Sequence, residues 1–204
     1  GLRYGTIQTP EKYWLSWKEA PIAHWPIATA GGFRGPPNVL DQAVMRVCAK
    51  ERFLELIHDF IVYDAGIKKL CRHNQFFGVK AAVEHVKKRE GGIIWHTQGS
   101  GKSLTMVWLA KWIRENITDA RVLIVTDRTE LDEQIQQVFT GVNEKIHRTA
   151  SGADLIDVLN KSEYALVCSL VHKFGGKASD DEGTVDFEKL ASALPEGFKA
   201  KGDL

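Results

Sequence analysis

The stretch Trp95-His96-Thr97-Gln98-Gly99-Ser100-Gly101-Lys102-Ser103 decides how this chain of 204 residues is interpreted. It holds two glycines, a lysine and a serine, and it begins at the end of the short apolar run Gly92-Ile93-Ile94-Trp95. We expect that run to be a buried parallel strand, and the apolar spacing after the stretch predicts a helix from Leu104 to Glu115. A strand, a glycine-rich turn and a helix in this order predict a phosphate-binding loop.

The residue types of this loop suit a nucleotide triphosphate. Gly99 and Gly101 let backbone N–H groups turn inward, where they and the helix N-terminus attract anionic oxygens. Lys102 is expected to contact the β- and γ-phosphates, and the Ser103 hydroxyl to ligate Mg²⁺. The alternative is a chance glycine-rich turn before a helix, which the flanking pattern disfavours. The loop residues predicted to bind ATP are Thr97, Gln98, Gly99, Ser100, Gly101, Lys102 and Ser103.

One position of the loop departs from the most common pattern. The pattern G-x-x-x-x-G-K-[ST] begins with glycine, where this chain has His96. In helicase-like motors the loop often has the sequence pattern A-x-x-G-x-G-K-[ST], and His96 takes the position of the alanine in that pattern. The absence of the first glycine therefore favours a helicase-like motor among the proteins with a phosphate-binding loop.

Composition excludes some classes of protein and leaves others open. With 44% hydrophobic residues, the chain can bury the core of one domain, or of one domain with part of another. No apolar run approaches the roughly 20 residues of a membrane-spanning helix, and the N-terminus lacks a signal peptide pattern, so we expect a cytoplasmic protein. Cys48, Cys71 and Cys168 are too few and too far apart for a disulfide framework or a C-x-x-C metal site. The net charge of +1 neither supports nor excludes a DNA partner.

Periodicity predicts an α/β fold with alternating strands and helices. Helical spacing runs from Val39 to Tyr63, as two short helices or as one broken near Ala49-Lys50. Further helices are predicted at 74–88, from Thr129 onward, at 153–160 with Ser151 as the cap, and at 185–194; strands are predicted at 4–9, 121–127 and 164–170. Together with 92–95, the last two strands predict an open parallel sheet with the nucleotide at the end of the first strand.

Three further elements match one family. They are Cys71-Arg72-His73-Asn74-Gln75-Phe76-Phe77-Gly78, the run Thr126-Asp127-Arg128-Thr129-Glu130-Leu131-Asp132-Glu133-Gln134, and Ser169-Leu170-Val171-His172-Lys173-Phe174-Gly175. With the phosphate loop, they resemble the motor (R) subunit of type I restriction–modification enzymes, an ATPase of helicase superfamily two. The resemblance implies a P-loop, RecA-like parallel sheet, ATP and Mg²⁺ as cofactors, and double-stranded DNA with the methylation and specificity subunits as partners.

The resemblance also assigns roles to residues. Gln75 takes the place of the family's adenine-reading glutamine; the alternative is a helix N-terminal residue without a ligand. Arg128 and Thr129 are implied to hold a DNA phosphate, and the alternative is a solvated turn in which Asp127 caps the helix. Ser169, His172 and Lys173 are implied to face DNA, with His172 in place of the family's glutamine and Ser169 in place of a threonine.

The resemblance divides the chain into four parts. Residues 1–27 resemble the C-terminal edge of the family's nuclease domain, 28–38 are a linker loop, 39–90 are a helical connector with the glutamine motif, and 91–204 are the front of the first ATPase lobe. The nuclease centre would lie upstream and the acidic Asp-Glu-x-His box downstream, so no complete catalytic set is expected here. The full subunit is implied to be an ATP-dependent DNA translocase and site-specific deoxyribonuclease. The alternatives are another superfamily two helicase or remodelling ATPase, and a non-catalytic nucleotide- or DNA-binding module.

Overall fold

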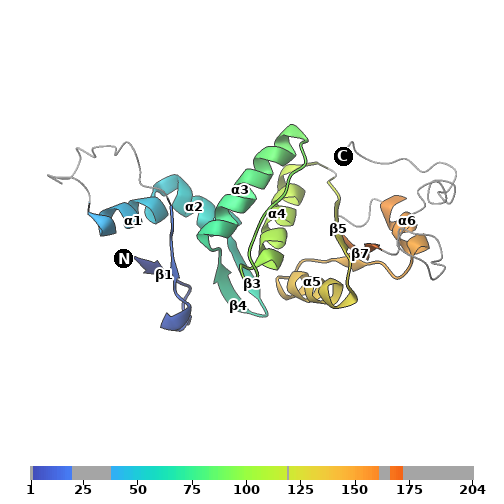
Figure 1. Ribbon diagram of the computed structural model, residues 1–204, viewed down its shortest axis with the longest axis horizontal. Helices are drawn as coiled ribbons and strands as arrows, with labels where there is room; N and C mark the ends of the chain where they lie inside the picture. Colours follow the sequence, from blue (N-terminus) through green and yellow to red (C-terminus); the bar gives the residue numbers. More distant parts are fainter. Residues whose placement is uncertain (1, 20–37, 119, 161–165, 172–204) are drawn as a thin grey trace.

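The computed structural model describes residues 2–19, 38–118, 120–160 and 166–171, and Figure 1 shows their arrangement. In chain order the elements are β1 (Arg3–Tyr4), the 3₁₀ helix η1 (Glu11–Tyr13), β2 (Leu15–Ser16), α1 (Val39–Cys48), α2 (Lys50–Asp59), β3 (Ile61–Asp64), β4 (Ile67–Leu70), α3 (His73–Lys88), α4 (Lys102–Asn116), β5 (Val122–Thr126), α5 (Thr129–Gly141), β6 (His147–Arg148), α6 (Gly152–Asn160) and β7 (Leu166–Leu170). Among these described helices, none has the length and apolar character needed to span a membrane. The predicted helix at 185–194 and most of the predicted linker, 28–37, lie outside the described residues.

The N-terminal segment forms a small antiparallel ladder. β1 pairs with β2, with Arg3 opposite Ser16 and Tyr4 opposite Leu15. The predicted strand over 4–9 is therefore wrong beyond its first residue. After Tyr4 the chain turns, since the Thr9 N–H donates to the Thr6 carbonyl at 3.0 Å. This hydrogen bond closes a turn, so the residues after Tyr4 bond locally and do not extend the strand.

The two helices predicted in the connector are confirmed, with their break at the expected place. Asn38 caps α1, because its Oδ1 accepts from the N–H groups of Leu40 at 2.8 Å and Asp41 at 2.9 Å. Ala49 has an extended backbone, with ψ at 133°, and separates α1 from α2. The capping residue and one extended residue thus set the bounds of α1.

The connector also holds a β-hairpin that helical spacing did not predict. β3 and β4 pair antiparallel from Ile61 opposite Leu70 to Asp64 opposite Ile67. The helical prediction to Tyr63 is therefore wrong in its last residues. The signal lay in the turn, where Gly66 has φ at 79°, a conformation that favours glycine.

An aromatic core joins the N-terminal segment to the central helices. Trp17, Phe60, Phe76 and Trp108 are all buried. Their ring centroids lie 5.3 Å apart for Trp17 and Phe76, 4.8 Å for Phe60 and Phe76, and 6.0 Å for Phe60 and Trp108. Since these rings come from the N-terminal segment, the end of α2, α3 and α4, one apolar cluster holds four separate pieces of chain together.

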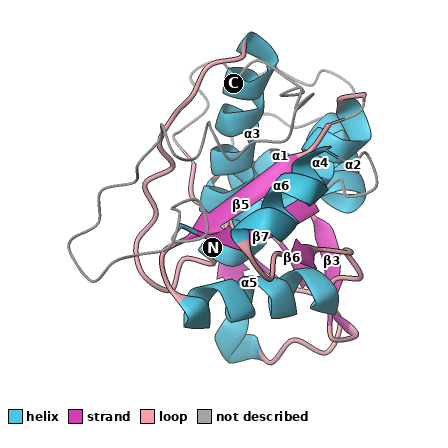
Figure 2. Cartoon of the chain, turned by 90° about the vertical axis from the view of Figure 1, so that its right-hand side faces the viewer, coloured by secondary structure: helices cyan, strands magenta, loops and turns pink. Residues whose placement is uncertain are grey.

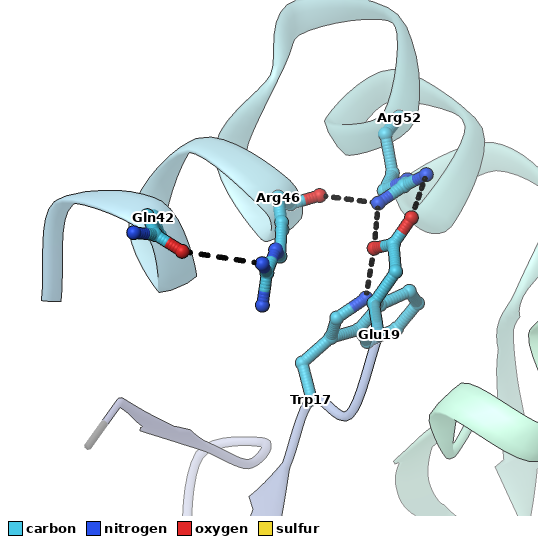
Figure 3. Close-up of polar contacts among 5 residues, drawn as sticks. All are labelled: Trp17, Glu19, Gln42, Arg46 and Arg52. Atoms are coloured by element: carbon cyan, nitrogen blue, oxygen red, sulfur yellow. Dashed lines mark hydrogen bonds and ion pairs between the residues drawn. The ribbon is translucent and has the colours of Figure 1, made fainter. Parts of the chain in front are cut away.

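A polar network closes the same junction from the outside (Figure 3). Arg52 on α2 binds both carboxylate oxygens of Glu19, at 2.6 and 3.2 Å, and also donates to the Arg46 carbonyl at 2.9 Å. The Trp17 indole donates to Glu19 at 2.9 Å. The Arg52 guanidinium also lies 5.5 Å from the centroids of the Trp17 and Phe76 rings. We call Trp17, Glu19 and Arg52 the N-terminal clasp.

The parallel sheet has three strands in the order β5-β7-β6. The predicted strands at 121–127 and 164–170 are confirmed as β5 and β7, which pair from Val122 opposite Leu166 to Thr126 opposite Leu170. Figure 2 shows α5 alongside the strands, and its Ile135 and Phe139 belong to the same apolar core. The α/β class with a parallel sheet is therefore confirmed.

The third strand differs from the one predicted. Residues 92–95 form no strand in the described structure, and Ile93 and Trp95 are 88% and 89% exposed. The third member of the sheet is instead β6, whose Arg148 pairs with Cys168 of β7. The prediction failed because an apolar run becomes a strand only where a neighbouring strand accepts its hydrogen bonds.

Candidate nucleotide-binding site

The loop that precedes α4 has the backbone expected of an anion cradle. Gly99 and Gly101 have φ at 72° and 86°, in the left-handed region that disfavours other residues. Gly101 is the N-cap of α4, with no side-chain hydrogen bond at the cap. Within the described part of the chain, no acceptor is bound to the N–H groups of Gly101, Lys102 and Ser103. These three donors at a helix N-terminus can therefore bind an anion.

The carbonyl groups at the start of the loop, those of His96 and Thr97, accept hydrogen bonds from the loop's own side chains. The Ser100 hydroxyl donates to the Thr97 carbonyl at 2.7 Å. The Lys102 ammonium donates to the carbonyls of His96 and Thr97, both at 3.3 Å. Both distances are long for a hydrogen bond, and Lys102 is exposed. Lys102 is therefore held near the loop by weak neutral acceptors, and phosphate oxygens would be stronger ones.

Gln75 of α3 is brought directly against the loop. Its side chain is 3% exposed, its Oε1 accepts from the Arg72 N–H at 2.8 Å, and its Nε2 donates to the Gly101 carbonyl at 2.9 Å. A Cβ atom at Gly101 would lie 2.4 Å from that Nε2, so any other residue at 101 would displace the Gln75 amide. Both amide atoms of Gln75 are used within the protein, and they join the start of α3 to the start of α4.

Sequence reasoning missed Arg72, which supports the loop beside Gln75. Arg72 donates from its guanidinium to the Gly99 carbonyl at 3.1 Å. The available signal was the spacing of three residues between Arg72 and Gln75, which is the N-cap to N3 spacing of a helix start. All of the residues predicted to bind ATP thus lie in the loop, in the first turn of α4, or in contact with the loop.

The loop fits a magnesium nucleotide in its donor set. Three N–H groups without a partner among the described residues, an exposed lysine and the half-buried Ser103 in the first turn of α4 match what a triphosphate and its metal ion require. Among the described residues, no group of three or more His, Cys, Asp or Glu side chains is placed to hold a metal ion without a ligand's help. Ser103 is the loop residue whose hydroxyl suits Mg²⁺ brought by the nucleotide.

The second predicted site, at the turn before α5, is exposed. The Arg128 side chain is 78% exposed and lies 3.7 Å from the Asp127 carboxylate. Arg128, and not Asp127, is the N-cap of α5, and it makes no side-chain capping bond. The alternative in which Asp127 caps the helix is therefore wrong, because the helix starts one residue later. Thr129, the first residue of α5, is also exposed.

Ser169 is placed differently from the other residues implied to face DNA. It is fully buried in β7, and its hydroxyl accepts from Thr149 at 2.8 Å. In this arrangement its hydroxyl bonds inside the protein. Its partners in the prediction, His172 and Lys173, lie outside the described residues. Since Thr126 pairs with Leu170, the C-terminal ends of strands β5 and β7 nevertheless lie at the same edge of the sheet.

A buried polar cluster beneath α5 was also missed by sequence reasoning. Asp132 is fully buried; it is ion-paired with Arg148 of β6 and accepts from the Cys168 thiol at 2.7 Å. The hydrogen bond to Asp132 raises the pKa of Arg148. An acidic residue in the first turn of a helix was the only signal in the sequence. The cluster ties α5 to two strands, which positions the Arg128 turn at the sheet edge.

Comparison with known proteins identifies a family for this chain. The sequence profile of the SWI2/SNF2 ATPase family matches residues 74–195. The chain is 34% identical over 162 residues to a Methanocaldococcus jannaschii protein described as a type I restriction enzyme MjaIXP endonuclease subunit, a match that covers 73% of this chain and 16% of that protein. It is 30% identical over 125 residues to the type I restriction enzyme HindI endonuclease subunit of Haemophilus influenzae, over 54% of this chain and 12% of that protein.

A third relative, the type I restriction enzyme SsaAORF53P endonuclease subunit of Staphylococcus saprophyticus, is 26% identical over 153 residues. The matches with these three relatives span 12% to 16% of the relatives' own lengths. The family profile covers more than half of this chain and includes both Gln75 and the phosphate loop. This chain therefore belongs to the SWI2/SNF2 ATPase family, and the three relatives named above are described as endonuclease subunits of type I restriction enzymes.

Proposed function

We propose that this chain binds Mg²⁺–ATP at the loop before α4, as part of a type I restriction endonuclease subunit. In the full subunit, this binding would drive ATP hydrolysis, translocation along double-stranded DNA and cleavage, together with methylation and specificity subunits. The observation that supports it best is the contact of Gln75 with Gly101, since it holds in one conformation a loop whose Gly101, Lys102 and Ser103 N–H groups have no partner within the described ranges.

Each residue has a separate task in this proposal. The N–H groups of Gly101, Lys102 and Ser103 receive phosphate oxygens, and Lys102 exchanges two neutral carbonyls for charged oxygens. Ser103 ligates the metal ion, which supplies charge neutralisation on the phosphates when bound. Gln75 is proposed to face the adenine as well, although both of its amide atoms already have protein partners.

The DNA-facing role is proposed for the turn before α5. Arg128 and Thr129 are exposed at the N-terminus of a 13-residue helix, where a guanidinium and the N–H groups of the first helical turn suit one backbone phosphate. Ser169 is left out of this proposal because its hydroxyl bonds inside the protein. His172 and Lys173 remain in it on the strength of the family resemblance.

The test is Mg²⁺–ATP binding by this chain, measured by calorimetry, with phosphate release followed in the same samples with and without duplex DNA. Lys102→Ala should abolish binding. Lys111→Ala is the matched control, since Lys111 lies on the same helix and faces Glu115 at 3.8 Å. We expect binding without phosphate release, because hydrolysis also needs carboxylates and cations beyond this loop. DNA-stimulated release would contradict that expectation, and absence of binding would refute the proposed ATP site.

A further inference from the structure

His96, the residue that departs from the common loop pattern, is packed against α3. Its imidazole faces Gly78, and a Cβ atom at Gly78 would lie 3.2 Å from Nε2 and 3.4 Å from Cε1 of that ring. Optimal separations between such atoms are about 3.5–4.0 Å, so a methyl group at 78 would require the ring to move by a few tenths of an ångström. Within the described residues, the buried Nδ1 of His96 has no hydrogen-bond partner, so this ring nitrogen gives the imidazole no polar anchor.

The backbone of the same histidine contacts the phosphate-binding lysine. The His96 carbonyl accepts from the Lys102 ammonium at 3.3 Å. A displacement of His96 would therefore move the start of the loop and one acceptor of Lys102 together. The opposite end of the loop, Gly101, is held by Gln75.

The two contacts come from one face of one helix. Gln75 and Gly78 are three residues apart in α3, and residues at this spacing are neighbours on a helix surface. Gln75 contacts the end of the loop and Gly78 contacts its beginning. The side of α3 that faces the loop thus determines the distance between the loop's two ends.

We propose that Gly78 and His96 form a matched pair, in which the missing side chain at 78 seats the imidazole and so positions the phosphate loop for nucleotide. This makes Gly78 a positioning residue, and it rests on the proposed ATP-binding function. Glycine inside a helix is otherwise unfavourable, because alanine at the same place loses less backbone entropy. A glycine in the interior of the 16-residue α3 is therefore explained by the space it leaves.

This pair predicts opposite effects on stability and on binding. Gly78→Ala should raise or preserve the melting temperature, since it improves helix propensity. It should also weaken Mg²⁺–ATP binding about fivefold, because a displaced loop must be reordered when the nucleotide binds. A purely structural glycine would not separate the two measurements in this way.

The experiment is a double-mutant cycle of Gly78→Ala and His96→Ala, with the dissociation constant of Mg²⁺–ATP and the unfolding curve measured for each chain. Removing the imidazole makes room at 78, so Gly78→Ala should have little further effect on affinity in the His96→Ala background. Gly91→Ala is the matched control, because no atom lies within 4 Å of the position that its Cβ would take.

Equal loss of affinity from Gly78→Ala in both backgrounds would overturn the pair, and so would no loss in the parent chain. The second result would mean that the imidazole tilts without cost into the adjoining cavity of about 420 Å³, which His96 lines with Ile94 and Leu109. If the parent chain binds no ATP, the proposed function fails. The same double-mutant cycle, measured on the free energy of unfolding, still tests whether Gly78 and His96 are in contact. Additive unfolding effects would then refute the pair.

Discussion

The turns that lead into α4 and α5 both stand at a helix N-terminus with no side-chain capping bond, but they are built differently. The turn before α4 has two glycines in the left-handed region, and α3 holds it through Gln75 and Arg72. The turn before α5 has no glycine, and its N-cap Arg128 makes no capping bond and is exposed.

The difference indicates which anion each turn suits. A triphosphate concentrates charge, and a loop already held in one conformation binds it without further ordering cost. A single phosphate of a DNA backbone needs only one flexible cation and a helix end. Side-chain bonds from α3 therefore distinguish the proposed ATP site from the proposed DNA contact, and each prediction below tests that distinction.

The largest effect is expected from Gly101→Ala. The substitution places a side chain at φ 86° and a Cβ 2.4 Å from Gln75 Nε2, so we expect ATP affinity to fall by about 100-fold or more, measured by calorimetry. Gly66→Ala is the matched control, since Gly66 has φ at 79° and nothing within 4 Å. The control should lose stability and leave ATP affinity unchanged; equal losses of affinity from both variants would refute the role of the Gln75 contact.

Gln75→Leu should have the next largest effect. It removes the bonds to the Gly101 carbonyl and the Arg72 N–H, and leaving buried groups unpaired costs about 1–3 kcal/mol each. We expect about tenfold weaker ATP binding and a lower melting temperature, with DNA affinity unchanged. If stability falls while ATP affinity stays the same, α3 supports the fold and not the loop.

The N-terminal clasp should affect stability and its dependence on pH. Burial acts to raise the pKa of Glu19, but hydrogen bonds from Arg52 and Trp17 outweigh it and lower the pKa below its ordinary 4.5. A carboxyl group with a lower pKa in the folded state stabilises the fold above its unfolded pKa, and this contribution is lost as the pH falls through the folded pKa.

Arg52→Leu should therefore lower the free energy of unfolding by about 1–2 kcal/mol at pH 7 and by less at pH 3.5, measured by urea unfolding. Glu19→Gln should flatten the same pH dependence. Lys80→Leu is the control, because its ion pair with Glu55 is more exposed and should contribute little. If Glu19→Gln leaves the pH dependence of the free energy of unfolding unchanged, the N-terminal clasp is not the source of that dependence.

The smallest effect is expected at the second turn. Arg128→Ala should weaken duplex DNA binding a few-fold, reduce the slope of affinity against salt by about 1, and leave ATP affinity unchanged. Lys88→Ala, an exposed cation at the end of α3, is the control for a general charge effect. An equal effect from both variants would remove Arg128 from the proposed DNA contact.

Sequence reasoning succeeded where the signal was local. The loop residues Gly99 and Gly101, the break at Ala49 and the cap of α6 at Ser151, whose hydroxyl accepts from Asp154 at 3.1 Å, all follow from backbone preferences of single residues. It failed at 92–95, where an apolar run lacks a partner strand, and at β3 and β4, where helical spacing continued past the end of α2.

The sequence by itself therefore determined that a glycine-rich loop precedes a helix, because φ preferences act within a few residues, and it predicted phosphate as the ligand of that loop. Only the tertiary structure decided which strands pair, that Asp132 is buried against Arg148, and that Gln75 and Gly78 contact the two ends of the loop. Those outcomes depend on contacts between residues far apart in the chain, whose free energies arise only once the helices and strands have packed.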